Sequence, residues 1–321
     1  MIGSDLVYAK QQLELGLTVG IPTETVYGLA GNALNEAAVL SIFKIKNRPF
    51  FDPLIVHVSN LESVKKFTLT IPEKAEKLAK AFWPGPLTLL LPKNNFVPSL
   101  VTSGSDYVAV RVPDHPMTLE LLNILDFPLA APSANPFGYI SPTRAEHVEQ
   151  QLGAKVSYIL DGGISNVGIE STIVDCNGPV VKVLRLGGLS IERIESELGE
   201  KVELMVHTNS DPQAPGQLDK HYSPESAFVL TDDIDREILV NKGKQISVLV
   251  FGEVKVPNDV FSLNLSPSGN IDEAALNLFH YMRLLDKLKS DLIIAMRVPA
   301  IGLGLAINDR LTRAASKFVK Q

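Results

Sequence analysis

Short apolar runs typical of β-strands alternate with helical patterns from residue 17 to about residue 200. This alternation indicates an α/β domain. We predict strands at 17–21, 54–58, 87–91, 107–112, 157–160 and 180–186, and helices at 35–47, 72–82, 115–125, 143–152 and 190–198.

The pattern changes beyond residue 200. Between about 201 and 225 the apolar periodicity fades, and proline, glycine and polar residues are dense, as in a linker. Apolar runs at 227–230, 246–251 and 291–296 then alternate with helical patterns at 271–289 and 304–320. A chain of 321 residues exceeds the size at which one core keeps growing. We therefore expect two α/β domains, the second one smaller.

Charge and cysteine content exclude several classes of protein. The formal net charge is -6, whereas proteins that bind nucleic-acid phosphates usually present a basic face, so an anion site must be built locally. Cys176 is the only cysteine, which excludes an intrachain disulfide and a thiolate metal cluster. Residues 1–16 lack the pattern of a signal peptide, and no apolar stretch reaches bilayer-spanning length. We expect a cytoplasmic protein that does not enter the membrane.

Two pairs of polar residues follow predicted elements. Thr23 and Thr25 lie two apart, so in extended chain their side chains share a face and can enter one pocket; a turn whose threonines bond the backbone is the alternative. Lys46 and Arg48 lie at the end of a predicted helix, and Pro49 disfavours helical geometry at Arg48. An ammonium and a guanidinium together suit a polyphosphate, and a solvated basic helix end is the alternative.

Further polar residues lie in apolar or proline-rich surroundings. Arg111 lies in an apolar strand, where an unpaired guanidinium is costly, so it should meet an anion on the protein or on a substrate. His57 lies in the run 54–58, where a satisfied core histidine is the default and a ligand contact the alternative. Ser133 and Asn135 are two apart between prolines, which favours an extended loop with both side chains on one face. Such loops bind ligands in α/β sheets, although a structural proline loop fits equally well.

Together these segments resemble the threonylcarbamoyl-AMP synthase family of the YrdC type, in its long form with a C-terminal extra domain. The resemblance rests on the order and spacing of motifs over nearly the whole chain. These motifs are PTETVYGLA, the pair Lys46 and Arg48, DPLIVHV, FWPGPLTLLL, VAVRVPDHP, the pair Ser133 and Asn135, GIESTIVD, LRLGG, APG, HYSP and NDRLTRAA.

The resemblance implies three parts of the chain and one reaction. Residues 1–203 would form a twisted open mixed sheet around a large cationic cavity, 204–225 a linker reaching over the site, and 226–321 a small Rossmann-like α/β domain. The enzyme would be a nucleotidyltransferase that converts L-threonine, bicarbonate or CO2, and ATP with Mg²⁺ into L-threonylcarbamoyladenylate and pyrophosphate. The product would pass to the machinery that modifies the tRNA adenosine next to the anticodon.

The resemblance also implies site residues at matching positions, but no metal ligands. L-threonine would contact Thr25, His57, Arg111, Ala131 and Ser171, with Arg111 on its carboxylate. ATP would contact Lys46, Arg48, Asp52, Tyr107, Ser133, Asn135, Ser141, Arg185 and Tyr222. As catalytic residues, Lys46 and Arg48 would neutralise charge that builds on the phosphates, without a covalent intermediate.

The chain departs from the family's commonest pattern at two positions. Asp52 stands where asparagine is frequent, and a negative charge there would help only if it faces Mg²⁺ or Lys46. Gln217 follows APG where methionine is more frequent, so only APG and HYSP carry the linker resemblance. The C-terminal part has Gly302 and Gly304 without a third glycine at Rossmann spacing. We expect it to position the linker as a lid that excludes water.

The sequence leaves two other functions open. A carbamoyltransferase on the same fold, which forms carbamoyl-adenylate, usually carries zinc fingers, for which one cysteine leaves no room. An RNA-binding module would use a concave basic surface for double-stranded or transfer RNA. The net charge of -6 argues against more than weak RNA binding.

Overall fold

The computed structural model describes residues 1–206, 215 and 221–316, which form two compact units. The first unit comprises Met1–Phe137, Pro142–Asn166 and Glu170–Leu218, and the second comprises Gly138–Ser141, Val167–Ile169 and Asp219–Gln321. Most of the predicted linker, including the alanine and glycine of APG, lies outside the described residues, as do residues 317–320 of the last predicted helix. The predicted domain bounds stay a prediction.

Within the described residues, the first unit holds an eleven-stranded sheet with parallel and antiparallel pairs. Its strands in order across the sheet are β1 (Ile2–Gly3), β8 (Tyr158–Leu160), β2 (Val19–Ile21), β3 (Gly28–Asn32), β7 (Leu129–Ala130), β4 (Ile55–His57), β6 (Tyr107–Arg111), β5 (Leu87–Pro92), β9 (Thr172–Asp175), β10 (Lys182–Arg185) and β11 (Glu203–Leu204). The mixed α/β fold that the sequence predicts is therefore present.

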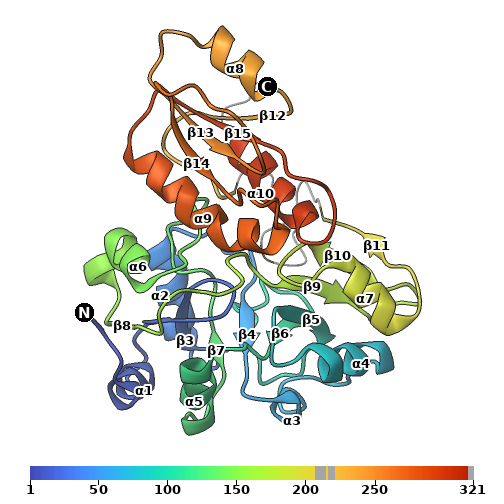
Figure 1. The fold of residues 1–321 in the computed structure, drawn as a ribbon. Helices are drawn as coiled ribbons and strands as arrows, with labels where there is room; N and C mark the ends of the chain where they lie inside the picture. Colours follow the sequence, from blue (N-terminus) through green and yellow to red (C-terminus); the bar gives the residue numbers. More distant parts are fainter. Residues whose placement is uncertain (207–214, 216–220, 317–321) are drawn as a thin grey trace. The chain divides into compact units, whose positions relative to one another are not determined.

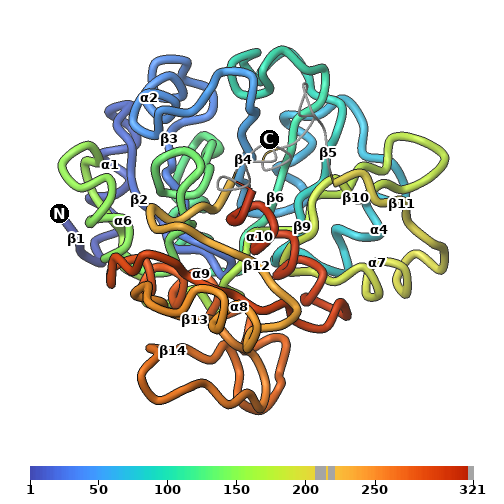
Figure 2. Tube along the Cα trace, turned by 90° about the horizontal axis from the view of Figure 1, so that it is seen from above, coloured from blue at the N-terminus to red at the C-terminus, as the bar shows by residue number. Residues whose placement is uncertain are grey.

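Five helices of this unit begin and end close to their predicted bounds, namely α2 (Glu36–Lys46), α4 (Glu73–Phe82), α5 (Pro116–Ile124), α6 (Ala145–Leu152) and α7 (Ile191–Leu198). The unit also contains α1 (Leu6–Glu14), α3 (Leu61–Val64) and a 3-10 turn (Gly153–Lys155). The Asn35 side chain caps α2, and Asn47 ends it in a left-handed conformation. This ending fixes where the pair Lys46 and Arg48 leaves the helix. Helices α4 and α7 lie side by side (Figure 1 and Figure 2).

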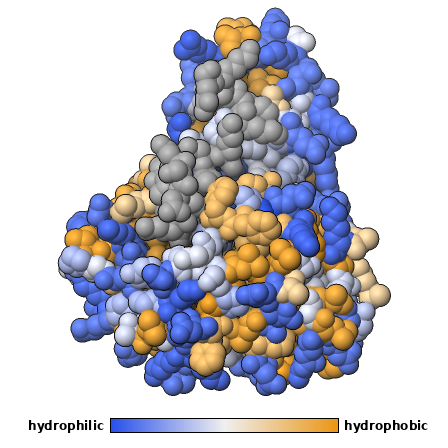
Figure 3. All heavy atoms as spheres, turned by 180° about the vertical axis from the view of Figure 1, so that it is seen from behind, coloured by the Kyte–Doolittle hydropathy of each residue, from blue (hydrophilic) through white to orange (hydrophobic). Residues whose placement is uncertain are grey.

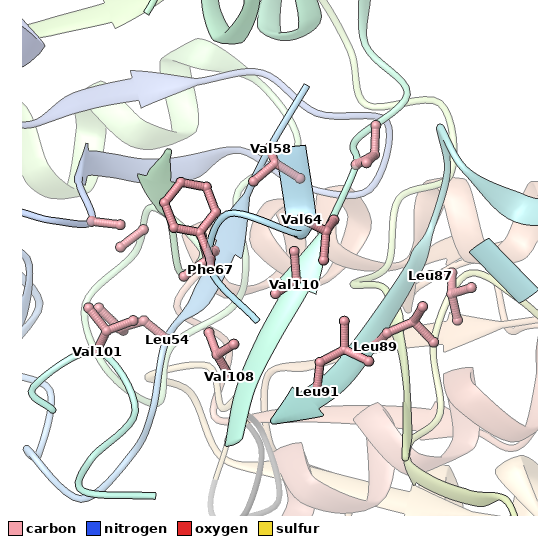
Figure 4. Packing of buried hydrophobic residues seen from close by; sticks show 14 of the residues in the cluster. Leu54, Val58, Val64, Phe67, Leu87, Leu89, Leu91, Val101, Val108 and Val110 are labelled. Carbon is pink, nitrogen blue, oxygen red and sulfur yellow. The ribbon is translucent and has the colours of Figure 1, made fainter. Parts of the chain in front are cut away.

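Alternate residues of the central strands point to opposite faces of the sheet. On one face, Leu89 of β5 and Val110 of β6 pack with Val58, Val64 and Phe67 in the main hydrophobic core (Figure 4). Full burial of such a side chain stabilises the fold by about 1.5–3 kcal/mol. The strand residues next to these core residues therefore point to the other face of the sheet. The polar side chains of β4, β5 and β6 lie on that face.

The second unit contains a four-stranded sheet among the described residues, and each neighbouring pair in it is parallel. Its strands in order are β12 (Phe228–Thr231), β15 (Leu292–Met296), β13 (Ile246–Val250) and β14 (Phe261–Asn264). Its helices are α8 (Ile234–Val240), α9 (Ile271–Lys287) and α10 (Gly304–Ser316). Helix α8 connects β12 to β13 and helix α9 connects β14 to β15, and parallel strands with such helical connections agree with the predicted Rossmann-like class.

One strand is absent from the strands predicted above. Residues 28–32 form β3 and pair with β2 on one side and β7 on the other. A Cβ at Gly31 would lie 3.2 Å from Ile42, so the glycine permits close packing of α2 on this strand. Tertiary packing here outweighs local propensity.

The surface is of ordinary composition. Each helix in the described part of the chain is too short or too polar to span a lipid bilayer. On the face in Figure 3, exposed apolar side chains lie among hydrophilic ones. Phe50, Phe51 and Phe96 are among the exposed apolar residues of the first unit. Scattered exposed apolar side chains are normal in globular proteins.

Candidate active site

Three buried polar side chains lie next to one another on the site face of the sheet, opposite the main core. His57 of β4 and Thr88 of β5 are both cross-strand partners of Arg111 in β6. Their exposed fractions are 3%, 0% and 3%. Cross-strand partners have their Cβ atoms about 5 Å apart on one face. The strand register thus gathers three side chains that are separated in the sequence.

The guanidinium of Arg111 contacts three groups of the protein. It forms an ion pair with Glu24, with 2.5 Å between Nη2 and Oε1. It also donates to Thr25 Oγ1 at 2.9 Å and to the Gly85 carbonyl at 3.2 Å. The anion expected near Arg111 is therefore a protein carboxylate. These contacts use three of the five guanidinium N–H groups, which leaves two for a ligand.

Both alternatives for the threonine pair hold in part. Thr23 Oγ1 donates to the Val26 carbonyl at 2.6 Å and accepts the Thr25 and Val26 N–H groups, so it stabilises a turn. Thr25 Oγ1 lies 2.8 Å from Thr23 Oγ1 and accepts from Arg111. Thr25 is therefore the member of the pair that reaches the polar cluster of the sheet.

His57 is held neutral at physiological pH. Burial, followed by the positive charge of Arg111, lowers its pKa to about 3. Its Nδ1 atom has no hydrogen-bond partner among the described residues. His57 is therefore not a core histidine with all of its hydrogen bonds satisfied, and a ligand contact remains available to it. The neutral ring can exchange a hydrogen bond with a ligand but is a poor proton acceptor.

Ser171 connects the polar cluster of His57, Thr88 and Arg111 to Arg185. Its hydroxyl lies 2.7 Å from Thr88 Oγ1 and accepts from Arg185 Nη2 at 3.0 Å. Arg185 Nε also donates to the Ser171 carbonyl, and its Nη1 donates to the Pro215 carbonyl at 3.1 Å. A Cβ at Gly187 would lie 2.4 Å from the Ser171 carbonyl carbon, so only glycine permits this close approach.

Lys46 brings two motifs together that are far apart in the sequence. Its ammonium donates to the carbonyls of Ser133 at 2.5 Å and Asn135 at 2.6 Å. Lys46 is 1% exposed and Arg48 is 7% exposed, so a solvated basic helix end is excluded. Burial, and then the charge of Arg48, lowers the pKa of Lys46 well below its usual value. Asn135 is buried and Ser133 is half-buried.

The departure at Asp52 has a structural explanation. Asp52 is fully buried, and its Oδ1 lies 2.8 Å from Arg48 Nη2. Arg48 also donates to the carbonyls of Asp52 and Pro53, at 3.0 and 2.7 Å. Burial raises the pKa of Asp52, while Arg48 and then Lys46 oppose the rise. The expected partner was Lys46 or Mg²⁺, but the group that Asp52 directly contacts is Arg48.

A pocket lies at the far end of the same sheet face. It has a volume of about 560 Å³, and its lining includes Phe51, Leu90, Tyr107, Asp175 and Lys182. Tyr107 is 40% exposed. It is four residues before Arg111 on β6, a distance of about 13 Å in a strand.

The strip between these two ends of the face is apolar. The buried cluster of Ile55, Leu90, Ala109, Ile173 and Leu184 lies there. The face thus has buried polar groups at one end, a buried apolar strip in the middle and a pocket at the other end.

The remaining predicted residues fall into two groups. Ala131 is buried in the first unit, where its N–H donates to the Ile55 carbonyl at 3.0 Å. Ser141 and Tyr222 belong to the second unit. The Tyr222 ring stacks on Phe279 with 5.5 Å between centroids, and the Arg310 guanidinium lies 5.1 Å from the Tyr222 centroid. The roles of these three positions in ligand binding stay predictions.

The acidic residues fit a metal ion that arrives with a nucleotide. The described residues contain no group of three or more His, Cys, Asp or Glu side chains that could hold a metal. Asp52 is a carboxylate in direct contact with one of the predicted phosphate cations, Arg48. Mg²⁺ is commonly held by one or two carboxylates together with substrate phosphates. The donor set suits that arrangement and not a cage built by the protein alone.

Two family models match the chain in succession. Residues 11–187 match the Sua5/YciO/YrdC model, described as "Telomere recombination", and residues 189–316 match "Threonylcarbamoyl-AMP synthase, C-terminal domain". A relative from Pyrococcus abyssi named threonylcarbamoyl-AMP synthase is 42% identical over 313 residues, which cover 94% of this chain and 91% of the relative. The chain belongs to the Sua5/YciO/YrdC family.

Other members of the family agree with this assignment. A threonylcarbamoyl-AMP synthase from Bacillus subtilis is 38% identical, covering 92% of this chain and 89% of the relative. The crystal structure of P. abyssi Sua5 complexed with L-threonine superposes with a TM-score of 0.90 at 39% identity, covering 97% of this chain and 94% of that one. The resemblance and the fold class that the sequence predicts are confirmed.

Proposed function

We propose that the chain is a threonylcarbamoyl-AMP synthase, which converts L-threonine, bicarbonate or CO2, and ATP into L-threonylcarbamoyladenylate and pyrophosphate. The observation that carries this proposal is the 42% identity to the P. abyssi enzyme over 94% of the chain. The match includes both the catalytic and the C-terminal family model. It favours the synthase over the carbamoyltransferase and the RNA-binding module that the sequence leaves open.

The polar end of the sheet face is the proposed threonine subsite. The two remaining N–H groups of Arg111 would bind the carboxylate as a fork. Neutral His57 would hydrogen-bond to the amino acid, because its pKa of about 3 is too low for a general base at pH 7. Thr25, Ala131 and Ser171 would line the remainder of the subsite. The neutral threonine nitrogen would attack CO2, form the N–C bond and release one proton to solvent, which gives the N-carboxy intermediate.

The cationic loops are the proposed ATP subsite. The N-carboxylate oxygen would form a bond to the α-phosphorus, and the bond from that phosphorus to the bridging oxygen of pyrophosphate would break. Lys46 and Arg48 would offset the negative charge that develops on the phosphate oxygens. Mg²⁺ bound to ATP would share this charge neutralisation. Ser133, Asn135, Ser141, Arg185 and Tyr222 would hold the nucleotide, and the pocket beside Tyr107 would receive part of it.

The wider setting belongs to the same proposal. The adenylate would be consumed by the machinery that modifies tRNA next to the anticodon, and any RNA binding by this chain itself would be weak. Because the reaction consumes ATP, we also propose the cytoplasm as its compartment.

A direct assay tests the function. The chain is incubated with ATP, Mg²⁺, L-threonine and ¹⁴C-bicarbonate, and labelled adenylate and pyrophosphate are measured. We expect both products only when threonine is present, and much less of each with Lys46→Ala. Absence of threonine-dependent pyrophosphate from the folded wild-type chain would overturn the proposal.

A further inference from the structure

Two short segments from the middle of the chain belong to the second unit. They are Gly138–Ser141 and Val167–Ile169. The first follows the loop that carries Ser133 and Asn135, and the second comes immediately before Glu170 and Ser171. Both segments are therefore continuous in the chain with residues of the candidate site.

Helix α9 fixes the first segment through one arginine. Arg283 is 4% exposed, and its Nε donates to the Ser141 carbonyl at 3.2 Å. Its Nη2 donates to the Ile140 carbonyl, and its guanidinium lies 5.4 Å from the centroid of the Tyr139 ring. Three successive residues of the segment thus contact a single side chain. A buried guanidinium presents its donors in a rigid fork, so it restricts the backbone that it binds.

Asp286 completes this contact one helical turn further on. The Tyr139 hydroxyl donates to its carboxylate. The same carboxylate accepts the N–H groups of Glu225 at 3.1 Å and Ser226 at 2.9 Å. Residues three apart lie on one face of a helix. Arg283 and Asp286 therefore form a charged face of α9 that is occupied by the backbone and tyrosine of other segments.

The second segment depends on a glycine. Gly168 has a φ of +82°, and a Cβ there would lie 2.5 Å from the Ala275 carbonyl oxygen and 2.5 Å from the Leu276 Cα. Both the conformation and the space admit only glycine. The backbone of α9 thus lies directly against Gly168, two residues before Glu170.

The ends of the first segment are anchored beside the candidate site. The Phe137 N–H donates to the Lys46 carbonyl at 2.8 Å, and the Tyr27 N–H donates to the Pro142 carbonyl at 2.8 Å. Four residues span at most about 14 Å. Ser141 therefore has little freedom once Arg283 holds its carbonyl.

We propose that Arg283 and Asp286 are positioning residues of the active site, which hold Gly138–Ser141 in the conformation that places Ser141 for ATP. This inference rests on the proposed function, in which Ser141 contacts the nucleotide. It gives helix α9 of the C-terminal unit a role in ATP binding through two side chains that would not contact the nucleotide themselves. Thr25, His57 and Arg111, which would bind the substrate threonine, are not part of these contacts with α9. We therefore expect substitutions of Arg283 and Asp286 to weaken the binding of ATP and not that of threonine.

The test compares Arg283→Gln, Arg283→Lys and Asp286→Asn with the wild-type chain. Lys287→Gln is the matched control, because Lys287 is an exposed cation on the same helix. We expect the KM for ATP to rise about tenfold in Arg283→Gln, which loses the charge-assisted donors, and clearly less in Arg283→Lys. The KM for threonine should stay within about twofold. Lys287→Gln should behave as wild type.

Several outcomes would overturn the inference. One is an unchanged KM for ATP in folded Arg283→Gln, and another is an equal rise of both KM values, because a general loss of structure predicts no selectivity. If Arg283→Gln does not fold, Asp286→Asn replaces it in the test, because asparagine preserves the shape of the side chain. The inference then requires that the KM for ATP rises in Asp286→Asn while the KM for threonine does not. If the wild-type chain binds a non-hydrolysable ATP analogue but releases no pyrophosphate, the proposed function alone fails. The affinities of the variants for that analogue then support or refute the positioning role.

Discussion

Replacement of Arg111 by lysine tests the threonine subsite most directly. The change retains one positive charge but replaces a planar fork of five donors by a compact ammonium. Arg111 now contacts Glu24 at 2.5 Å, Thr25 at 2.9 Å and the Gly85 carbonyl at 3.2 Å. An ammonium that remains with Glu24 cannot reach all three groups with the same geometry. The variant therefore retains the buried ion pair and loses the surrounding hydrogen bonds.

The expected magnitudes follow from these contacts. Loss of two hydrogen bonds from a buried charged group lowers the free energy of unfolding by about 2–4 kcal/mol. Loss of bidentate pairing with the threonine carboxylate weakens binding by about 2–3 kcal/mol, which raises the KM for threonine about 30- to 150-fold. The KM for ATP should change less than about threefold, because none of the ATP cations contacts Arg111 directly.

The assay is pyrophosphate release at varied threonine with saturating ATP, and at varied ATP with saturating threonine. Urea unfolding measures the stability of each variant. Arg236→Lys is the control, because Arg236 is exposed on α8. Arg48→Lys is the converse variant and should mainly raise the KM for ATP. Equal effects of Arg111→Lys and Arg48→Lys on both substrates would refute the division of the site.

Three further predictions concern packing, pH and thiol reactivity. Gly187→Ala should destabilise the fold by about 1–3 kcal/mol in urea unfolding, because its Cβ would overlap the backbone at 170–172, whereas Gly178→Ala, with space around its Cβ, should be neutral. The pKa of His57 is about 3 in the folded state and about 6.5 when unfolded, so only the unfolded state binds a proton as pH falls below 6.5. The wild type should therefore lose about 2 kcal/mol more stability than His57→Gln between pH 7 and pH 5, and equal losses would contradict this. Burial raises the pKa of Cys176 to about 12, so iodoacetamide should label the native thiol at least about 100-fold more slowly than the urea-unfolded one.

The sequence predicts elements better than it predicts contacts. Local pattern predicts strands at LIVHV and LTLLL, and β4 and β5 form there. The partners of Lys46 could not be predicted, because the two carbonyls that it contacts lie 87 and 89 residues away. Spacing indicated that Lys46 and Arg48 act together, but not that Arg48 folds back on Asp52.

Two residues of the candidate site were not assigned from the sequence. Thr88 is the single polar residue in the run LTLLL, and that interruption is the signal that could have found it. Glu24 lies between Thr23 and Thr25, but its role depends on Arg111, 87 residues away. The sequence required an anion for Arg111 and left open whether the protein or a substrate supplies it. Only tertiary structure decides between such alternatives, because sequence periodicity carries no information on long-range pairing.

The two ion pairs explain how an acidic chain can contain a cationic site. Burial of a charge costs several kcal/mol unless a partner offsets it. The positive charge of Arg111 is offset by the carboxylate of Glu24, and that of Arg48 by the carboxylate of Asp52. The charges of these two arginines are therefore compensated within the protein. Lys46 instead donates to two carbonyls, which are dipoles without net charge. Burial lowers the pKa of Lys46 well below its usual value, so a bound polyphosphate would stabilise the charged form of this lysine, and the net charge of -6 gives no indication of such a site.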